Sequence, residues 1–372
     1  MASGITLREA EESDLPNLTE FLNRGFPQIS RDQWMTRFDM FWADNPAFNQ
    51  DFTPRGWVLN HDSQIVGFYG NIPVKFYINQ KEALAAGATS WYVDPQYRGI
   101  YSMQIFSAFH KQSNVDLFLH TTPNNEVQIV LPRYQFSRLI LPFNCVEFLY
   151  ILDYFKALKL FLQYKSRGSR HTLAKESRTN CPRLLSKFPL KNLEDDTLTC
   201  SVIHEYDKSF EELWKSHLGE KRCFAELSRD TQTMNWLYFS KAIRHKRRVI
   251  QCRNSMDSSL LGYIVFDIIT PYNSTSKIFK MVDMFIPNLR RDVIEALISY
   301  AIFLGKKEKV AIFSFSTLDN SLYTIFEEYF KFHRTEEDVY FYKFHKNITV
   351  PSEEDIYQLI SPSLLDPDRG CL

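Results

Sequence analysis

The sequence lacks the cysteine and histidine patterns that hold metal ions. Its six cysteines include no pair separated by two residues, and none has a histidine nearby at metal-ligand spacing. Scattered cysteines of this kind are typical of free thiols in a reducing compartment. The sequence therefore predicts no metal site.

Signals for export and membrane insertion are also missing. No run approaches the roughly 18 apolar residues that a transmembrane helix requires. The stretch MASGITLREAEESD is polar and acidic, whereas a signal peptide begins basic and continues apolar. We therefore expect a cytoplasmic location and no transmembrane segment.

No charge of one sign is in excess. Lys+Arg and Asp+Glu number 44 each, so no overall field favours nucleic acid or a membrane. The motifs of phosphate-binding loops, serine hydrolases, zinc proteases and dinucleotide-binding folds are absent from the sequence. Phosphotransfer, serine hydrolysis, zinc proteolysis and dinucleotide redox chemistry therefore lack their usual motifs.

The chain does contain two similar series of predicted elements. In the first series, helical spacing in ESDLPNLTEFLNRGF and SRDQWMTRFDMFWADNP precedes three β-rich runs, which are followed by WYVDPQYRGIYSMQIF, a strand, turn and helix start. The second half repeats this order with few identical residues, and FKMVDMFIPNLRRDVI takes the place of that turn. We predict an α/β protein of the mixed α+β kind, formed by two duplicated domains, each a mostly antiparallel mixed sheet flanked by helices.

Composition sets the predicted boundaries. The four segments are a first domain at 1–153, a basic helix and linker at 154–197, a second domain at 198–347 and a C-terminal tail at 348–372. Between residues 154 and 191, ten Lys or Arg stand against one acid. The helix YFKALKLFLQYK in this segment is either a bridge packed between the domains or a docking surface for an acidic partner or an anionic membrane.

The order of elements, with VDPQYRG between a strand and a helix, resembles the GNAT acyltransferase superfamily. The resemblance covers residues 1 to about 150, and 198–345 in outline. It implies an N-acyltransferase with acetyl-CoA or another acyl-CoA as donor and a small-molecule amine or amino sugar as acceptor. It also implies that the turn is a nest of backbone amides that holds the donor pyrophosphate, because helix N-termini carry unpaired N–H groups and about half a positive charge.

The resemblance also assigns donor-binding residues. These are Trp91, Tyr92, Val93, Arg98, Gly99, Ile100, Tyr101, Ser102 and Asn125. Gly99 would allow close backbone approach, and the strand from Trp91 to Val93 would pair with the pantetheine arm of the donor. The chain departs from the family pattern at Tyr101, where a small residue is usual, and at Leu131, where the family has a tyrosine that acts as general acid.

Two residues are candidates for proton transfer. Tyr134 lies three residues after Leu131, about 60° short of a full helical turn, so it can replace the family tyrosine only if the helix breaks at Pro132. His120 ends the predicted strand VDLFLH, where this architecture splays two strands apart, and an ordinary histidine pKa of about 6.5 suits proton transfer. The alternative is that His120 is a structural, hydrogen-bonded histidine. Tyr69, Tyr92 and Asp94 are weaker candidates.

Three functions remain compatible with the sequence. The first is an acyltransferase that uses acyl-CoA, or an acyl carrier protein docked on the basic linker. The second is an aminoacyl- or peptidyl-type transferase that uses charged transfer RNA. The third is a non-catalytic binding or scaffold protein, as Tyr101, Leu131 and the glycine-free second turn would allow. The basic run KAIRHKRR supports at most weak phosphate contacts, so we expect no specific nucleic-acid binding.

Overall fold

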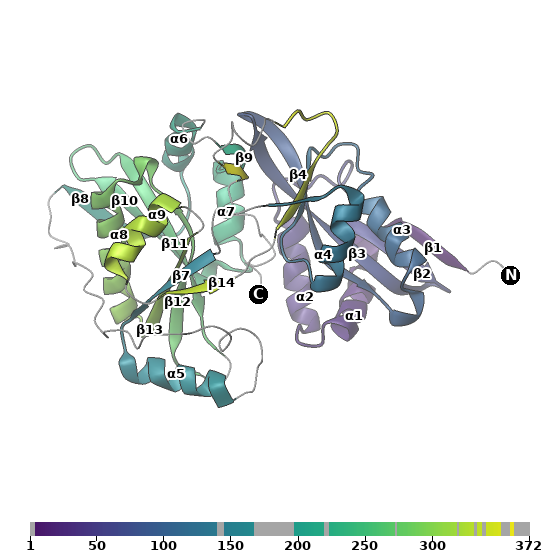
Figure 1. Ribbon diagram of the computed structural model, residues 1–372, viewed down its shortest axis with the longest axis horizontal. Helices are drawn as coiled ribbons and strands as arrows, with labels where there is room; N and C mark the ends of the chain where they lie inside the picture. The colour runs from purple at the N-terminus through teal and green to yellow at the C-terminus, as the bar shows by residue number, and fades with distance from the viewer. Residues whose placement is uncertain are drawn as a thin grey trace.

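The computed structural model describes residues 4–139, 145–166, 197–218, 223–271, 274–317, 320–330, 333–336, 340–350 and 358–360. Two mixed β-sheets with flanking helices make up this part of the chain (Figure 1). The predicted fold class is confirmed. The linker after residue 166 and most of the predicted tail lie outside the described residues.

The first sheet is formed mainly by the N-terminal half. Its strands from that half are β1 (Ile5–Glu9), β2 (Gly56–His61), β3 (Gln64–Ile78), β4 (Lys81–Val93), β5 (Leu117–His120) and β6 (Ser137–Arg138). The helices are α1 (Leu15–Gly25), α2 (Arg31–Phe38), α3 (Ile100–Phe109) and α4 (Asn125–Val130), with short helical turns η1 (Glu12–Asp14), η2 (Asp39–Ala43), η3 (Pro95–Tyr97) and η4 (Leu131–Tyr134). Side chains alternate between the sheet faces, so Val58 packs toward α1 and α2 while Trp57 and Leu59 pack toward α3.

The second sheet is formed mainly by the C-terminal half. The elements of this half are β8 (Leu198–Ile203), α6 (Lys208–Ser216), β9 (Cys223–Leu227), α7 (Thr231–Phe239), η5 (Arg244–Lys246), β10 (Arg247–Asn254), β11 (Leu260–Ile269), β12 (Lys277–Phe285), η6 (Pro287–Leu289), α8 (Arg291–Lys307), β13 (Val310–Thr317), α9 (Asn320–Tyr329), β14 (His333–Glu336), β15 (Phe341–Phe344) and β16 (Gln358–Ile360). Between the halves lie β7 (Cys145–Ile151) and α5 (Tyr154–Ser166).

The two sheets repeat one arrangement. The order β1-β2-β3-β4-β5 corresponds to β8-β10-β11-β12-β13, and the parallel pair is β4–β5 in the first sheet and β12–β13 in the second. In each sheet, the antiparallel pair beside this parallel pair has a register shift. The shift lies between Phe68 and Gly70 of β3 in the β3–β4 pair, and between Val265 and Phe266 of β11 in the β11–β12 pair. The predicted internal duplication is confirmed.

The closing strands of the two halves are exchanged. β7 lies between β13 and β14 in the second sheet, and β15 lies between β5 and β6 in the first. In addition, β9 pairs with β3 and β16 pairs with β9, so both extend the first sheet. The sequence placed β7 with the first domain and β15 with the second. That placement is wrong for the sheets, because a hydrophobic pattern predicts a strand but not its partner.

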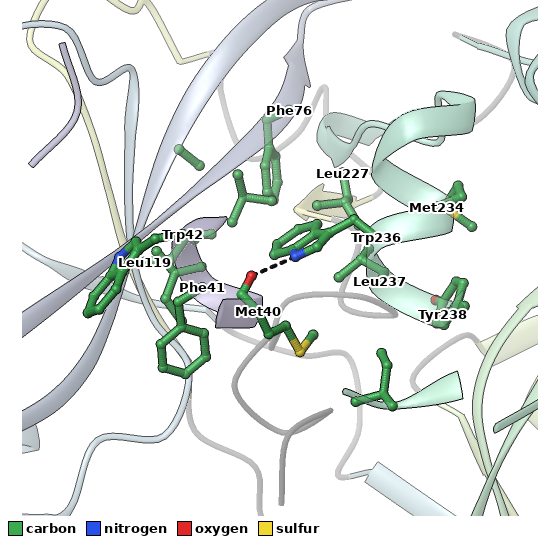
Figure 2. Close-up of a cluster of buried hydrophobic side chains, with 14 of the residues drawn as sticks. Met40, Phe41, Trp42, Phe76, Leu119, Leu227, Met234, Trp236, Leu237 and Tyr238 are labelled. Carbon is green, nitrogen blue, oxygen red and sulfur yellow. Dashed lines mark hydrogen bonds between the residues drawn. The ribbon is translucent and has the colours of Figure 1, made fainter. Parts of the chain in front are cut away.

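Helices from both halves meet in one hydrophobic core. This core contains Leu18 and Phe38 of α1 and α2 together with Phe210 and Leu237 of α6 and α7. Figure 2 shows the centre of the contact, where the indole Nε1 of Trp236 donates a hydrogen bond to the backbone oxygen of Met40 at 2.7 Å. The two sheets are therefore held together by buried apolar surface as well as by the exchanged strands.

The shared core contains a buried ion pair. The guanidinium of Arg229 donates to both carboxylate oxygens of Asp283, at 2.7 and 3.0 Å, and the exposed fractions of the two side chains are 8% and 0%. The hydroxyl of Tyr263 accepts a further hydrogen bond from Arg229. Two opposite charges removed from water in this way depend on each other.

We expect Asp283→Ala to lower the free energy of unfolding by about 3–5 kcal/mol, because Arg229 stays buried without its counter-charge. Urea unfolding followed by circular dichroism measures the change. The matched control is Glu20→Ala, which removes a carboxylate from the ion pair with Arg31, whose side chains are 57% and 59% exposed. The control should cost no more than about 1 kcal/mol. Equal losses of unfolding free energy in the two variants would contradict the conclusion that buried Arg229 depends on Asp283.

Candidate functional site

The first sheet opens between β4 and β5. These strands pair only over residues 85–87 and 117–119, although β4 continues to Val93. The far edge of β5 is occupied by β15. Among the described residues, no strand pairs with β4 on this side beyond residue 87. This edge of β4 is therefore the place in the sheet where a ligand can add as a strand.

The end of β4 directs backbone groups toward this open edge. The amide of Asp94 donates to the oxygen of Val66 at 2.9 Å, so these two residues form a hydrogen-bonded pair of the antiparallel ladder. Such pairs alternate with non-hydrogen-bonded pairs, and Val93 is paired in register with Gly67. The N–H and C=O of Val93 consequently point away from β3.

The side chains of Trp91 and Tyr92 lie on opposite faces of β4. The Trp91 ring packs against Tyr69 and Phe106, with centroid distances of 5.1 Å each, on the α3 face. Tyr92 faces the other core, where a Cβ atom at Gly25 would lie only 2.7 Å from its ring. Trp91 therefore lines the opening. Neither the side chain of Tyr92 nor its backbone groups point there, because Tyr92 is paired in register with Phe68 and the alternation directs its N–H and C=O toward β3.

The turn after β4 leads directly into α3. Gly99 is the N-cap residue and has φ +83° and ψ −115°, a conformation that residues with a side chain rarely adopt. A Cβ atom built at Gly99 would meet no other atom within 4 Å. The space beside Gly99, at the N-terminus of α3, is therefore open, and Gly99 allows close approach to its backbone.

The other predicted donor residues surround this turn. Arg98 is exposed, and its Nε donates to the oxygen of Val93 at 3.1 Å. Ile100 is 69% exposed, and Ser102 is half-buried. Tyr101 is half-buried against the cluster that contains Trp57, Phe106 and Phe118, so its bulk packs toward the core.

Asn124 and Asn125, at the start of α4, have different roles. The side chain of Asn124 is the helix cap and accepts a hydrogen bond from the amide of Val127 at 2.9 Å. Asn125, the residue predicted to bind the donor, is exposed as the first residue of the helix.

The helix breaks before Tyr134, as a role for Tyr134 in proton transfer requires. The α-helix α4 ends at Val130, and the chain continues as the 3₁₀ turn η4, in which residues three apart lie one full turn apart. Leu131 is buried, whereas Tyr134 is 36% exposed and its ring lies 4.8 Å from that of Phe106. The backbone oxygen of Tyr134 accepts a hydrogen bond from Lys343 of β15 at 2.8 Å.

His120 lies beneath these aromatic rings. Only 4% of its surface is exposed, and its ring contacts Phe106 and Phe136. Its Nε2 lies 3.3 Å from the hydroxyl of Tyr69 and 3.5 Å from Nε2 of His110. His110 was not among the predicted site residues, and its place at the end of the predicted helix after the Gly99 turn is the sequence feature that could have indicated it. Tyr69, His120 and His110 form a buried chain of groups that can each hold or pass a proton.

Both histidines are held in the neutral form. Burial, and then the neighbouring His110, keep the pKa of His120 well below its usual range. Burial, and then the charge of Lys343, lower the pKa of His110 to about 3. Burial also raises the pKa of Tyr69, so that its hydroxyl keeps its proton. The interior end of the site is therefore uncharged at neutral pH.

The equivalent turn of the second sheet differs. Asn288 and Leu289 adopt positive φ angles of 53° and 46° without a glycine, and α8 follows. The carboxylate of Asp292 lies in the first turn of α8 and pairs with Arg290 at 2.7 Å. The positive end of this helix thus already has an anion from the chain itself.

Only part of the basic run KAIRHKRR lies on the surface. Arg247 is 5% exposed at its side chain and pairs with Asp267 at 2.6 Å. Arg248 pairs with Glu308 at 2.7 Å. Two of the charges that suggested a phosphate-binding patch are therefore engaged within the protein.

The described residues contain no group of three or more His, Cys, Asp or Glu side chains placed to hold a metal ion. In the same part of the chain, no helix combines the length and apolar character needed to cross a bilayer.

Solved structures share this architecture. A conserved protein of Enterococcus faecalis V583, described as a probable N-acyltransferase, has a TM-score of 0.58 at 11% identity, and the match covers 91% of this chain and 72% of that one. A GCN5-related N-acetyltransferase from Anabaena variabilis has a TM-score of 0.58 at 9% identity, with the same coverage of 91% and 72%. The chain has the GNAT fold.

N-myristoyltransferase from Saccharomyces cerevisiae, solved with bound myristoyl-CoA, also has this GNAT-type arrangement in common with the chain. The TM-score is 0.52 at 12% identity, and the match covers 92% of this chain and 82% of that one, so both sheets are included. Identities this low show the fold alone. No protein-family model and no curated protein matches the chain by sequence.

We expect the stability of the protein to fall as the pH is lowered below about 6.5, because unfolded His110 takes up a proton there while the folded residue stays neutral down to a pKa of about 3. Each such histidine contributes about 1.4 kcal/mol per pH unit. Urea unfolding at a series of pH values measures the slope. His110→Gln should lower this slope by the contribution of one proton, about 1.4 kcal/mol per pH unit, whereas His245→Gln, at an exposed position, should leave the slope unchanged. Equal slopes in the two variants would refute this.

Proposed function

We propose that the chain is an acyl-CoA-dependent N-acyltransferase whose active site is the opening of the first sheet, and we take acetyl-CoA as the first donor to test. One observation carries this proposal: the unpaired edge of β4 ends at the Gly99 turn and the N-terminus of α3. A strand edge suits the extended amide-bearing pantetheine arm, and a helix N-terminus suits a pyrophosphate. Solved structures similar to this chain include a GCN5-related N-acetyltransferase and an N-myristoyltransferase with bound myristoyl-CoA.

The proposed donor contacts follow the chain. The backbone from Trp91 to Val93 pairs with the pantetheine arm. The N–H groups from Gly99 to Ser102 hold the pyrophosphate, with the cation of Arg98 beside them. Asn125, exposed at the start of α4, lies at the edge of this surface as a polar contact to the donor.

The proposed reaction is direct attack of an amine on the thioester. The N–C bond forms as the C–S bond breaks, and the N–H of Val93 polarises the carbonyl, because it points to the open edge. The proton leaving the amine passes to neutral His120, and Tyr134 donates a proton to the leaving thiolate. The contacts of His120 with Tyr69 and His110 allow the proton to be shared along the buried chain.

Acceptor, carrier and location are further parts of the proposal. A small-molecule amine or amino sugar is the acceptor class, and an acyl carrier protein that docks on the basic segment after Tyr154 is a second donor source. A cytoplasmic location agrees with the absence of a spanning helix in the described part of the chain. The scaffold alternative draws support from Leu131, which is buried and cannot donate a proton.

Calorimetric titration of acetyl-CoA and CoA into the purified protein tests the donor site. We expect micromolar binding by the wild type and its loss in Gly99→Trp, because the indole fills the space beside the first amides of α3. Lys111→Trp, exposed at the other end of α3, is the control and should bind normally. If the wild type shows no heat at millimolar ligand, the Gly99 turn does not bind the donor. The scaffold and transfer-RNA alternatives are then favoured over the acyltransferase.

If acyl transfer to an amine is found, Tyr134→Phe should lower kcat by about 10²–10⁴-fold with little change in KM for the donor, because it removes only the proposed acid. The ring contact with Phe106 is kept. Release of free CoA thiol follows the rate. Tyr77→Phe, which removes a hydroxyl bonded to Glu82 away from the opening, is the control and should keep the wild-type rate. An unchanged kcat in Tyr134→Phe would exclude this residue as the acid.

A further inference from the structure

Helix α5 packs on the second sheet by one side only. Ala157 and Leu160 are 1% and 2% exposed, and they form a small core with Ala311 and Ile312 of β13. Figure 1 shows α5 at the lower left, beside β13 and apart from the first sheet. The helix therefore does not bridge the two sheets.

The opposite side of α5 carries large apolar side chains. Phe155 is 89% exposed, Leu158 is 57% exposed and Leu162 is 58% exposed. Positions i, i+3 and i+7 form one stripe on a helix of 3.6 residues per turn. By the same geometry this stripe lies opposite Ala157 and Leu160. Three such residues side by side differ from the single apolar residues scattered on most protein surfaces.

Positive charge borders the stripe. Lys159 is exposed next to Leu158, and Lys156 is half-buried with its ammonium 2.9 Å from Asp153, which also accepts from the first turn of the helix. The sequence that follows, 167–191, has seven Lys or Arg and one acidic residue. An apolar face bordered by lysines is the pattern of helices that lie in a membrane interface.

We propose that the face of Phe155, Leu158 and Leu162 lies on the surface of a bilayer that contains anionic lipids. The apolar side chains enter the boundary between headgroups and acyl chains, and Lys159, exposed at the border of the face, reaches the lipid phosphates. A bilayer fits better than an acidic protein because the centre of the face is apolar and the charges are at its border. The binding is peripheral and weakens with salt. This inference does not depend on the proposed acyltransferase activity.

Sedimentation of the full-length protein with vesicles tests the inference. We expect binding to vesicles of phosphatidylcholine mixed with phosphatidylglycerol, and little binding to phosphatidylcholine alone. The triple variant Phe155→Ser, Leu158→Ser, Leu162→Ser should lose about tenfold or more in partitioning, and Lys159→Glu alone should also weaken it. The control Met256→Ser, Phe303→Ser removes apolar side chains that are 92% and 52% exposed elsewhere, and it should bind as the wild type does.

Three results would overturn the inference. They are absence of wild-type binding to either kind of vesicle, equal binding by the triple variant, and binding of an acidic acyl carrier protein through this face without vesicle binding. Thermal unfolding of each variant confirms the fold, since the substituted side chains are exposed. Acetyl-CoA titration of the same preparations separates the two proposals, because the face on α5 and the Gly99 turn lie on different elements.

Discussion

The exchange of closing strands is the constraint on which the rest of the structure depends. β5 is held on its far edge by β15, while β4 is held by β3, so the two strands belong to different neighbours where their own pairing ends. The opening in the first sheet is thus set by a strand from the other end of the chain. Phe341 pairs with His120, and Lys343 holds the backbone oxygen of Tyr134. The candidate site is therefore built from residues of both halves of the chain.

The same framework has been put to different uses in its two copies. In the first, the N-cap residue of α3 is Gly99, with open space beside it; in the second, the N-cap residue of α8 is Arg290, which pairs with Asp292 in the first turn. The interior of the second copy contains the ion pair of Arg229 and Asp283, and its helix α7 joins the common core through Trp236. An open helix end in one copy and a filled end in the other give the molecule a single candidate donor site and a structural partner for it.

Local patterns in the sequence predicted the local features of the structure. Hydrophobic periodicity and turn residues predicted the order of elements. A break at Pro132 was only the condition for a role of Tyr134, and the structure has a 3₁₀ turn there, with Tyr134 beside Phe106. The partners of β7 and β15 could not be predicted, because strands with similar apolar patterns compete for the same edges. His110 was not predicted because its contact with His120 depends on how α3 packs on β5, which the sequence pattern does not show.

The charge distribution divides the candidate site into two ends. The turn at Gly99 offers amide groups and the cation of Arg98, whereas the interior end is lined by Phe106, Trp91 and the neutral histidines. An anion is stabilised at the first end, and an ammonium ion is disfavoured at the second because desolvating it is unfavourable. Under the proposed activity, the acceptor amine therefore loses its proton before or during its approach to the thioester. Under the same proposal His120 would hold that proton only briefly, because its surroundings destabilise the charged imidazolium, and the polar groups within reach of its Nε2 are the Tyr69 hydroxyl and Nε2 of His110.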